Sequence, residues 1–229
     1  MSITSLDQVE MNKVRLKCPV QPADLKPLKL GDLVYLDGVI FTGREGLYHR
    51  LLEEKQELPV PWSEVSNVNF HCSPAAAPTA DGGYLVRAVT ATASFRFGKW
   101  MTQFFDKTGV KLVLGKGGMQ AKDYKRLFVP QGAIYLTTVG YGLGATYGRG
   151  ITRVKAVHWL KELGIAQAVW VLEVENMGPF IVESDAEGNS LFELSNREVN
   201  KNLDKVYAGL PQPTLRRYGE ETDRAEEVV

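Results

Sequence analysis

Cysteine and histidine are scarce in this sequence. The 229 residues include 2 cysteines and 3 histidines. Two thiols cannot build a disulfide framework, and by themselves they cannot hold an iron–sulfur cluster or a structural zinc ion. The histidines, His49, His71 and His158, do not show the spacing of metal ligands. We therefore expect that this chain on its own binds no metal ion.

A net charge and a long apolar run are also missing. Lys and Arg number 27, as do Asp and Glu, so the formal net charge is zero. Neutrality removes a general electrostatic case for nucleic acid but leaves room for a local basic site. No segment approaches the ~20 apolar residues of a membrane-spanning helix, and residues 1–10 lack the features of a signal peptide. We expect a cytoplasmic protein with reduced thiols that contacts neither nucleic acid nor membrane.

The remaining composition is typical of a globular domain. Hydrophobic residues make up 44% and charged residues 24% of the chain. A chain of this length can bury a core without help from disulfides or metal ions. We predict one domain over residues 26–210. Residues 1–25 carry Pro19 and Pro22 and are predicted to form an arm or an edge strand outside the core. Residues 211–229, with five acids and three arginines, are predicted to be a polar tail.

The pattern of apolar residues predicts an α/β fold. Strand patterns come first and then alternate with helical patterns, which is typical of a mixed sheet flanked by helices. Ser195 and Glu198 form a capping-box pattern before the last predicted helix, and the composition of residues 74–83 predicts a loop. The predicted strands are two short ones within 28–40, then 67–72, 84–92, 110–114, 133–139 and 168–174, and a hairpin of 180–182 with 191–194. The predicted helices are 47–55, 97–108, 119–127, 154–163 and 199–210.

Three loops share a design that suits anions, because each follows a predicted strand, precedes a predicted helix and combines a cation with small or hydroxylated neighbours. They are residues 42–44 with Arg44, residues 90–96 with Arg96, and residues 115–118 with Lys116. The start of a helix offers unpaired N–H groups, and glycine lets the backbone approach a ligand closely. Arginine can grip a carboxylate with two bonds, whereas lysine acts as a point charge. The loops predict a site for a small dianion, and tight turns with solvated cations are the alternative.

A later glycine-rich segment raises the alternative of a nucleotide-dependent enzyme. Gly140-x-Gly142-x-x-Ala145 follows a predicted strand, and Glu162 lies within the window of a ribose-binding carboxylate. We favour a connection that packs closely on a helix, because no second mononucleotide-binding half follows. The loop at 115–118 is not a P-loop, since it lacks Gly-x-x-x-x-Gly-Lys-Ser/Thr.

In order and spacing, the motifs resemble the iron–sulfur hydro-lyases, the group of class I fumarase and L(+)-tartrate dehydratase. The similarity is to their C-terminal domain, which is a separate β subunit in two-subunit members, and it covers residues 26–195. The segments that carry it are Thr-Gly-Arg at 42–44, Thr92 and Arg96, Gly-Lys-Gly-Gly-Met at 115–119, Val-Trp-Val-Leu-Glu-Val at 169–174, and Gly-Asn-Ser-Leu-Phe at 188–192. The resemblance implies a swivelling β/β/α fold, consistent with the mixed order of elements.

The resemblance also implies an activity and a set of site residues. Members of the family add water reversibly to an unsaturated dicarboxylate, such as fumarate to give malate, with a [4Fe–4S] cluster held by the α part. By the motif match, Arg44, Arg96, Lys116 and Gly117 would bind substrate, and Thr92 would be the catalytic threonine. This chain would then be the β subunit of an α2β2 heterotetramer, active only with its cluster-bearing α subunit.

Three positions depart from the family pattern. The family has Gly-Pro-Thr where this chain has Thr-Ala-Thr at 90–92, Gly-Arg-Asp where it has Gly-Arg-Glu at 43–45, and methionine where it has Phe97. Fumarate is the substrate that we expect first. The alternatives are a tartrate- or mesaconate-type dehydratase subunit and a non-catalytic anion-binding paralogue, which would keep Arg44 and Lys116 without needing a catalytic threonine.

Overall fold

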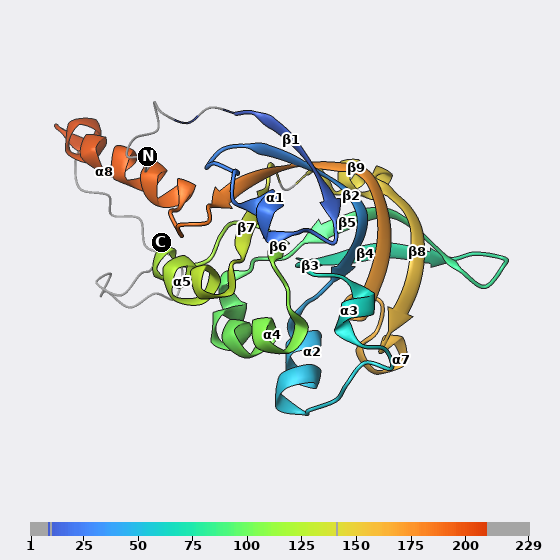
Figure 1. Ribbon diagram of the computed structural model, residues 1–229. Coiled ribbons are helices and arrows are strands. Elements are labelled where there is room, and N and C mark those ends of the chain that lie inside the picture. The colour runs from blue at the N-terminus through green and yellow to red at the C-terminus, as the bar shows by residue number, and fades with distance from the viewer. Residues whose placement is uncertain (1–8, 10, 141, 210–229) are drawn as a thin grey trace, which may run out of the picture.

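The computed structural model describes residues 9, 11–140 and 142–209 (Figure 1). Within these residues, seven strands form one sheet in the order β1-β2-β3-β6-β7-β9-β8, and β4 and β5 form a separate hairpin. The predicted tail at 211–229 lies outside the described residues. The strands are β1 Lys13–Cys18, β2 Leu33–Thr42, β3 Val68–Phe70, β4 Cys72–Pro78, β5 Tyr84–Ala91, β6 Leu112–Gly115, β7 Ile134–Thr138, β8 Ile151–His158 and β9 Val169–Ser184.

The sheet is mixed and closes on itself. β1, β2, β3, β6 and β7 run parallel to their neighbours in this group, whereas β9 is antiparallel to β2, β7 and β8. Because the long strand β9 pairs with β7 near its end and with β2 along much of its length, the pairings β2-β3-β6-β7-β9 return to β2. The predicted α/β class with a mixed sheet and flanking helices is confirmed.

Short helices connect and cover the strands, and Figure 1 shows α2, α4 and α5 gathered on one side of the sheet. Among the described residues, no helix has the length and apolar character needed to cross a membrane. The helical segments are α1 Pro22–Leu25, α2 Glu45–Tyr48, η2 His49–Glu53, α3 Trp62–Val65, η3 Phe95–Trp100, α4 Met101–Thr108, α5 Ala121–Asp123, η4 Tyr124–Phe128, η5 Val129–Gln131, α6 Gly144–Arg149, α7 Leu160–Leu163 and α8 Leu191–Tyr207.

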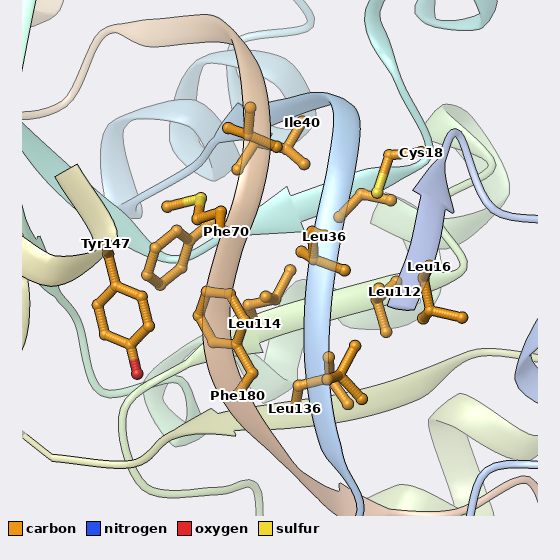
Figure 2. Close-up of a cluster of buried hydrophobic side chains, with 14 of the residues drawn as sticks. Leu16, Cys18, Leu36, Ile40, Phe70, Leu112, Leu114, Leu136, Tyr147 and Phe180 are labelled. Carbon is orange, nitrogen blue, oxygen red and sulfur yellow. The ribbon is translucent and has the colours of Figure 1, made fainter. Parts of the chain in front are cut away.

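Two apolar clusters pack on the two faces of the central strands. Leu112 and Leu114 of β6 belong to one cluster and Val113 to the other, because successive side chains of a strand point to opposite faces. Figure 2 shows the first cluster, in which side chains such as Leu36, Leu114 and Phe180 gather from β2, β6 and β9. Burial on both faces explains why these strands read as nearly continuous apolar runs.

The predicted helix over 154–163 was wrong. Residues up to His158 form strand β8, and only Leu160–Leu163 is helical. The pairing of β8 with β9 shifts register between Val154 and Ala156. Such an irregularity interrupts the two-residue period of a strand, so the apolar spacing imitates a helix.

The predicted hairpin of 180–182 with 191–194 was also wrong. β9 continues to Ser184, and Leu191 begins α8. Ser190 is the N-cap of this helix, and its hydroxyl accepts a 3.1 Å hydrogen bond from the Glu193 amide. The helix therefore begins earlier than predicted, at a Ser-x-x-Glu pattern that lies five residues before Ser195 and Glu198.

Two further predictions fail in the first half of the chain. Residues 74–83 are not all loop, because β4 extends to Pro78. Residues 28–40 hold one long strand rather than two, since β2 passes through Gly38 with a register shift. Gly38 has φ +110°, and a Cβ there would come within 2.2 Å of the Cys18 carbonyl oxygen. Gly38 therefore lies at an irregularity inside the strand, where a side chain would clash with the neighbouring strand.

Residues 11–25 contribute more to the core than predicted. β1 is an edge strand of the sheet and pairs in parallel with β2. Leu16 and Cys18 are nevertheless buried, because alternate side chains of an edge strand still face the core. Val20 and Leu25 join the same cluster. The predicted edge strand is therefore confirmed, whereas the prediction that these residues lie outside the core was wrong.

Candidate active site

The carboxyl ends of the central parallel strands gather three loops at one edge of the sheet. The Gly43 amide, just after β2, donates to the Phe70 carbonyl at 3.0 Å, and the His71 amide, just after β3, donates to the Leu114 carbonyl at 2.7 Å. The chain segments that leave β2, β3 and β6 are therefore hydrogen-bonded side by side. The carboxyl ends of parallel strands are where ligands bind in both open and closed α/β sheets.

Thr92 and Lys116 are joined at this edge. The Thr92 amide donates to the His71 carbonyl at 2.7 Å, and the Lys116 amide donates to the Thr92 carbonyl at 3.1 Å. Ala93 and Lys116 form an isolated parallel bridge. Thr92 is 6% exposed. The end of β5 and the loop after β6 are thus bonded into one structure that holds the predicted catalytic threonine next to a predicted substrate cation.

Arg44 lies against the hairpin that leads to Thr92. Its Nη1 donates to the Ser73 hydroxyl at 2.5 Å and approaches the Ala166 carbonyl at 3.5 Å. Ser73 of β4 pairs with Thr90 of β5. Burial raises the pKa of the neighbouring Cys72 thiol well above its ordinary value, and the Arg44 charge only partly opposes this effect. The guanidinium is therefore held against the β4–β5 hairpin that leads to Thr92, near a thiol that stays protonated.

Arg96 and Gly117 lie close in sequence to Thr92 and Lys116. Arg96 is in η3, which follows Thr92, and Gly117 directly follows Lys116. Arg96 is exposed within η3, and its guanidinium carbon lies 5.7 Å from the centroid of the Phe97 ring. Gly117 has φ +67°, and space is open beside its Cα. The structure therefore bonds Thr92 to Lys116 and sets Arg44 against the same hairpin, whereas Arg96 and Gly117 are only near these residues in the chain.

The glycines at 115 and 118 let the backbone of this segment lie very close to buried hydroxyl groups. A Cβ on Gly115 would lie 2.1 Å from the Ser94 hydroxyl oxygen and 2.5 Å from the Tyr135 hydroxyl oxygen. A Cβ on Gly118 would lie 2.8 Å from the Tyr124 hydroxyl oxygen. These distances are shorter than van der Waals contact, so the loop rests directly on buried hydroxyl groups that a larger residue would displace.

A buried chain of hydrogen bonds beneath the loops was not predicted. His71 Nε2 lies 2.6 Å from the Tyr48 hydroxyl, and His71 Nδ1 lies 2.6 Å from the Ser94 hydroxyl. The Ser94 hydroxyl in turn lies 2.7 Å from the Tyr135 hydroxyl. Burial lowers the pKa of His71 to about 3, so the imidazole is neutral at physiological pH. The sequence spacing of the histidines gave no signal for this arrangement.

A buried carboxyl group, Glu183, was also missed. One of its oxygens accepts a 2.6 Å hydrogen bond from the Ser190 hydroxyl, whereas Oε2 has no partner among the described residues. Burial raises its pKa to about 7, although the nearby Ser190 and Tyr124 hydroxyls oppose the change. A Cβ on Gly118 would lie 3.3 Å from the Glu183 carboxyl carbon. An acid with a pKa near neutrality therefore underlies the predicted substrate loop.

The two cysteines do not fit an iron–sulfur cluster, which needs several thiolates gathered around one site. Cys18 and Cys72 are both buried free thiols on separate strands. Burial raises the pKa of Cys18 to about 12. The described part of the chain holds no group of three or more His, Cys, Asp or Glu side chains arranged for a metal ion.

The fold and the loops define an α/β domain that presents cations and a buried threonine at one sheet edge. Its sequence matches the family model described as Fumarase C-terminus over residues 2–195. It is 35% identical over 184 residues to "Putative L(+)-tartrate dehydratase subunit beta" of Methanocaldococcus jannaschii, a match that covers 80% of this chain and 93% of that protein. The chain belongs to the fumarase C-terminus family, and the resemblance seen in its motifs is confirmed.

Two further relatives show how the family is organised. L(+)-tartrate dehydratase subunit beta of Escherichia coli K12 is 33% identical over 189 residues, which cover 79% of this chain and 87% of that protein. "Putative fumarate hydratase class I" of Geobacillus stearothermophilus is 32% identical over 184 residues, which cover 80% of this chain but 34% of that longer protein. The same domain therefore occurs both in proteins named as subunits and within a longer chain.

Proposed function

We propose that this chain is the β subunit of a heteromeric hydro-lyase that adds water to, and removes it from, a small dicarboxylate. The observation that carries the proposal is the backbone bond between Thr92 and Lys116 at the edge where Arg44 also lies. Relatives named dehydratase β subunit and class I fumarate hydratase support a reaction of this kind.

In this proposal Thr92 transfers a proton. A threonine hydroxyl is a weak base, so it needs a neighbouring cation or a partner base. Removal of a proton beside a carboxylate develops negative charge, which the ammonium of Lys116 would stabilise. Because Thr92 and Lys116 are joined through their backbones, the two side chains would start from a fixed separation of their main chains.

Arg44, Arg96 and Gly117 would hold the substrate carboxylates. A guanidinium can bind a carboxylate with two parallel hydrogen bonds. Arg44 is already fixed by Ser73, whereas Arg96 is exposed, so the two would grip carboxylates at different depths of the site. The open space beside Gly117 would let its backbone approach the ligand.

The other half of the site would come from an α subunit. Exposed apolar side chains border the loops: Phe95 is 58% exposed, Val139 44% and Phe192 40%. Phe192 lies next to Gly118, and Val139 follows β7 at the same edge. Apolar groups gathered beside a polar site are typical of a surface that a partner covers. We assign the [4Fe–4S] cluster to that α subunit, in an α2β2 assembly of the cytoplasm.

Fumarate, hydrated to malate, is the substrate that we propose first. L-tartrate is the second candidate, which the names of the two β-subunit relatives favour. Phe97, where the family pattern has methionine, is 1% exposed and stacks 4.8 Å from the Tyr48 ring. This departure therefore changes the packing beneath the site rather than the surface that meets substrate.

Replacement of Thr92 in the assembled complex tests this assignment. Thr92→Ala should lower kcat by about 10²- to 10⁴-fold because it removes the hydroxyl that transfers the proton. Thr90→Ala makes the same change on the exposed face of β5 and should leave kcat within about twofold of wild type. Turnover of fumarate, mesaconate and L-tartrate would be measured for both variants. Unchanged turnover in Thr92→Ala would exclude the catalytic role and favour the non-catalytic anion-binding paralogue.

A further inference from the structure

The hydrogen-bond chain Tyr48–His71–Ser94–Tyr135 forms a buried polar floor under the proposed site. All four residues are completely buried. They come from four parts of the fold, namely α2, the segment after β3, the segment after β5, and β7. Because buried polar groups need partners, a chain that satisfies each member fixes the separation of the elements that supply them.

This floor lies within the second apolar cluster, to which Tyr48, Phe97 and Tyr135 belong. The Phe97 ring lies 4.8 Å from both the His71 and the Tyr48 ring centroids. A neutral imidazole carries one donor and one acceptor. Tyr48 and Ser94 hold its two nitrogens, so both requirements are met. Within this apolar cluster, water cannot replace a missing hydrogen-bond partner. The loss of any one hydroxyl would therefore weaken the attachment between the two elements that its hydrogen bond joins.

The floor connects to the site through both backbone and side chains. The His71 carbonyl accepts the hydrogen bond of the Thr92 amide, and the His71 imidazole holds Ser94, two residues further along the chain. The Ser94 hydroxyl also touches the backbone at Gly115, directly before Lys116. A single imidazole therefore anchors the loop of Thr92, and through Ser94 it supports the loop of Lys116.

We propose that His71, Ser94 and Tyr135 are positioning residues that set the geometry between Thr92 and Lys116. The proposal rests on the hydro-lyase function proposed above, and it deepens that function by naming residues that do not touch substrate. Small displacements of reacting groups lower turnover far more than they lower binding that several cations share.

Ser94→Ala tests the proposal in the assembled complex, with Ser66→Ala as its matched control. Ser66 is also a buried serine, and its hydroxyl donates to the Val39 carbonyl at 2.6 Å, but it precedes β3 at the opposite end of that strand. We expect Ser94→Ala to lower kcat by about 10- to 100-fold with KM within about threefold of wild type. Ser66→Ala should leave both constants within about twofold. A kcat for Ser94→Ala within twofold of wild type, or an equal loss in both variants, would overturn the proposal.

Amide hydrogen exchange of the full chain separates this proposal from the proposed function. The Thr92 and Lys116 amides should exchange at least about tenfold faster in Ser94→Ala than in Ser66→Ala, whether or not any substrate is turned over. Equal exchange would overturn the positioning role, whereas an inactive wild-type complex with the expected exchange would contradict only the hydro-lyase assignment. If Ser94→Ala does not fold, Tyr135→Phe removes one terminal hydroxyl, keeps the ring, and carries the same expectations.

Discussion

Glu183 is an acid side chain that folding removes completely from water. Its carboxyl group lies beneath Gly118, and Tyr124, Tyr135 and Asp185 are the titratable groups around it. Its pKa of about 7 exceeds the ordinary value of 4.5 because burial disfavours the charged form. The folded protein therefore holds a proton that the unfolded chain has already released between these two values.

The pH dependence of stability should reveal this proton. Because the folded pKa of Glu183 is raised, its contribution to stability is fully present below about pH 4.5 and is lost as pH rises through 7, by about 3 kcal/mol in total. Glu183→Gln should abolish the loss, so the variant should gain stability relative to wild type as pH rises. Urea denaturation at pH 5 and pH 8 measures this difference.

His71 titrates in the opposite sense without affecting that comparison. Its folded pKa of about 3 lies below the ordinary 6.5, so protonation favours the unfolded chain as pH falls through this window. Both proteins carry His71, and its effect cancels in the difference between them. A stability difference between Glu183→Gln and wild type that stays constant from pH 5 to pH 8 would contradict the raised pKa of Glu183.

The glycine loop after β6 is a structural element that depends on the absence of side chains. Gly115→Ala should destabilise the protein by about 1–3 kcal/mol, because its Cβ would displace the Ser94 and Tyr135 hydroxyls. Gly142→Ala is the control, since nothing lies within 4 Å of a Cβ at that position. Urea denaturation of both variants checks the prediction, and equal stability of Gly115→Ala and wild type would refute it.

Local signals predicted most strands and helices but misplaced some of their boundaries. Buried strands such as β6 and β7 are short apolar runs between turn residues, so the sequence alone located them. β8 was misread because a bulge converts a strand period into helical spacing. The start of α8 was misplaced because two Ser-x-x-Glu patterns follow each other and only tertiary packing selects Ser190.

The candidate site was predictable to the extent that its signals are local. Each loop carries its own glycine or hydroxyl beside a cation, which is why Arg44, Arg96 and Lys116 could be grouped before the fold was known. Thr92 was added only by the resemblance to the family. The floor beneath them has no such signal, because His71 lies 23 residues from both Tyr48 and Ser94, and Ser94 lies 41 residues from Tyr135. Only the pairing of β3 with β6 and of β6 with β7 brings these residues together.

At the scale of the whole molecule, neutrality and local charge are compatible. The chain has no net charge, yet the order of its parallel strands places the loops of Arg44, Arg96 and Lys116 at one edge. The hairpin β4–β5, which extends from the body of the protein in Figure 1, begins at this edge and returns Thr92 to it. The arrangement suits a small dianion rather than a polyanion.

Two features of the whole molecule, its buried thiols and its exposed apolar side chains, indicate that the chain should not act alone. Its thiols are buried and protonated, and apolar side chains including Phe95 and Phe192 stand exposed beside the loops. Under our proposal this site is half of a reaction centre. It has buried polar residues beneath it and exposed apolar side chains around it, and the described residues supply it with no thiolate ligand. The family match supports this view, since relatives are named as β subunits.

Reconstitution tests the central claim most directly. This chain, an α subunit carrying the iron–sulfur cluster, and their mixture would each be assayed anaerobically for hydration of fumarate and dehydration of L-tartrate. We predict that neither protein alone is active and that the mixture turns over at least one of the two substrates. Hydration by this chain alone would contradict the divided site, and an inactive mixture on both substrates and on mesaconate would contradict the hydro-lyase function.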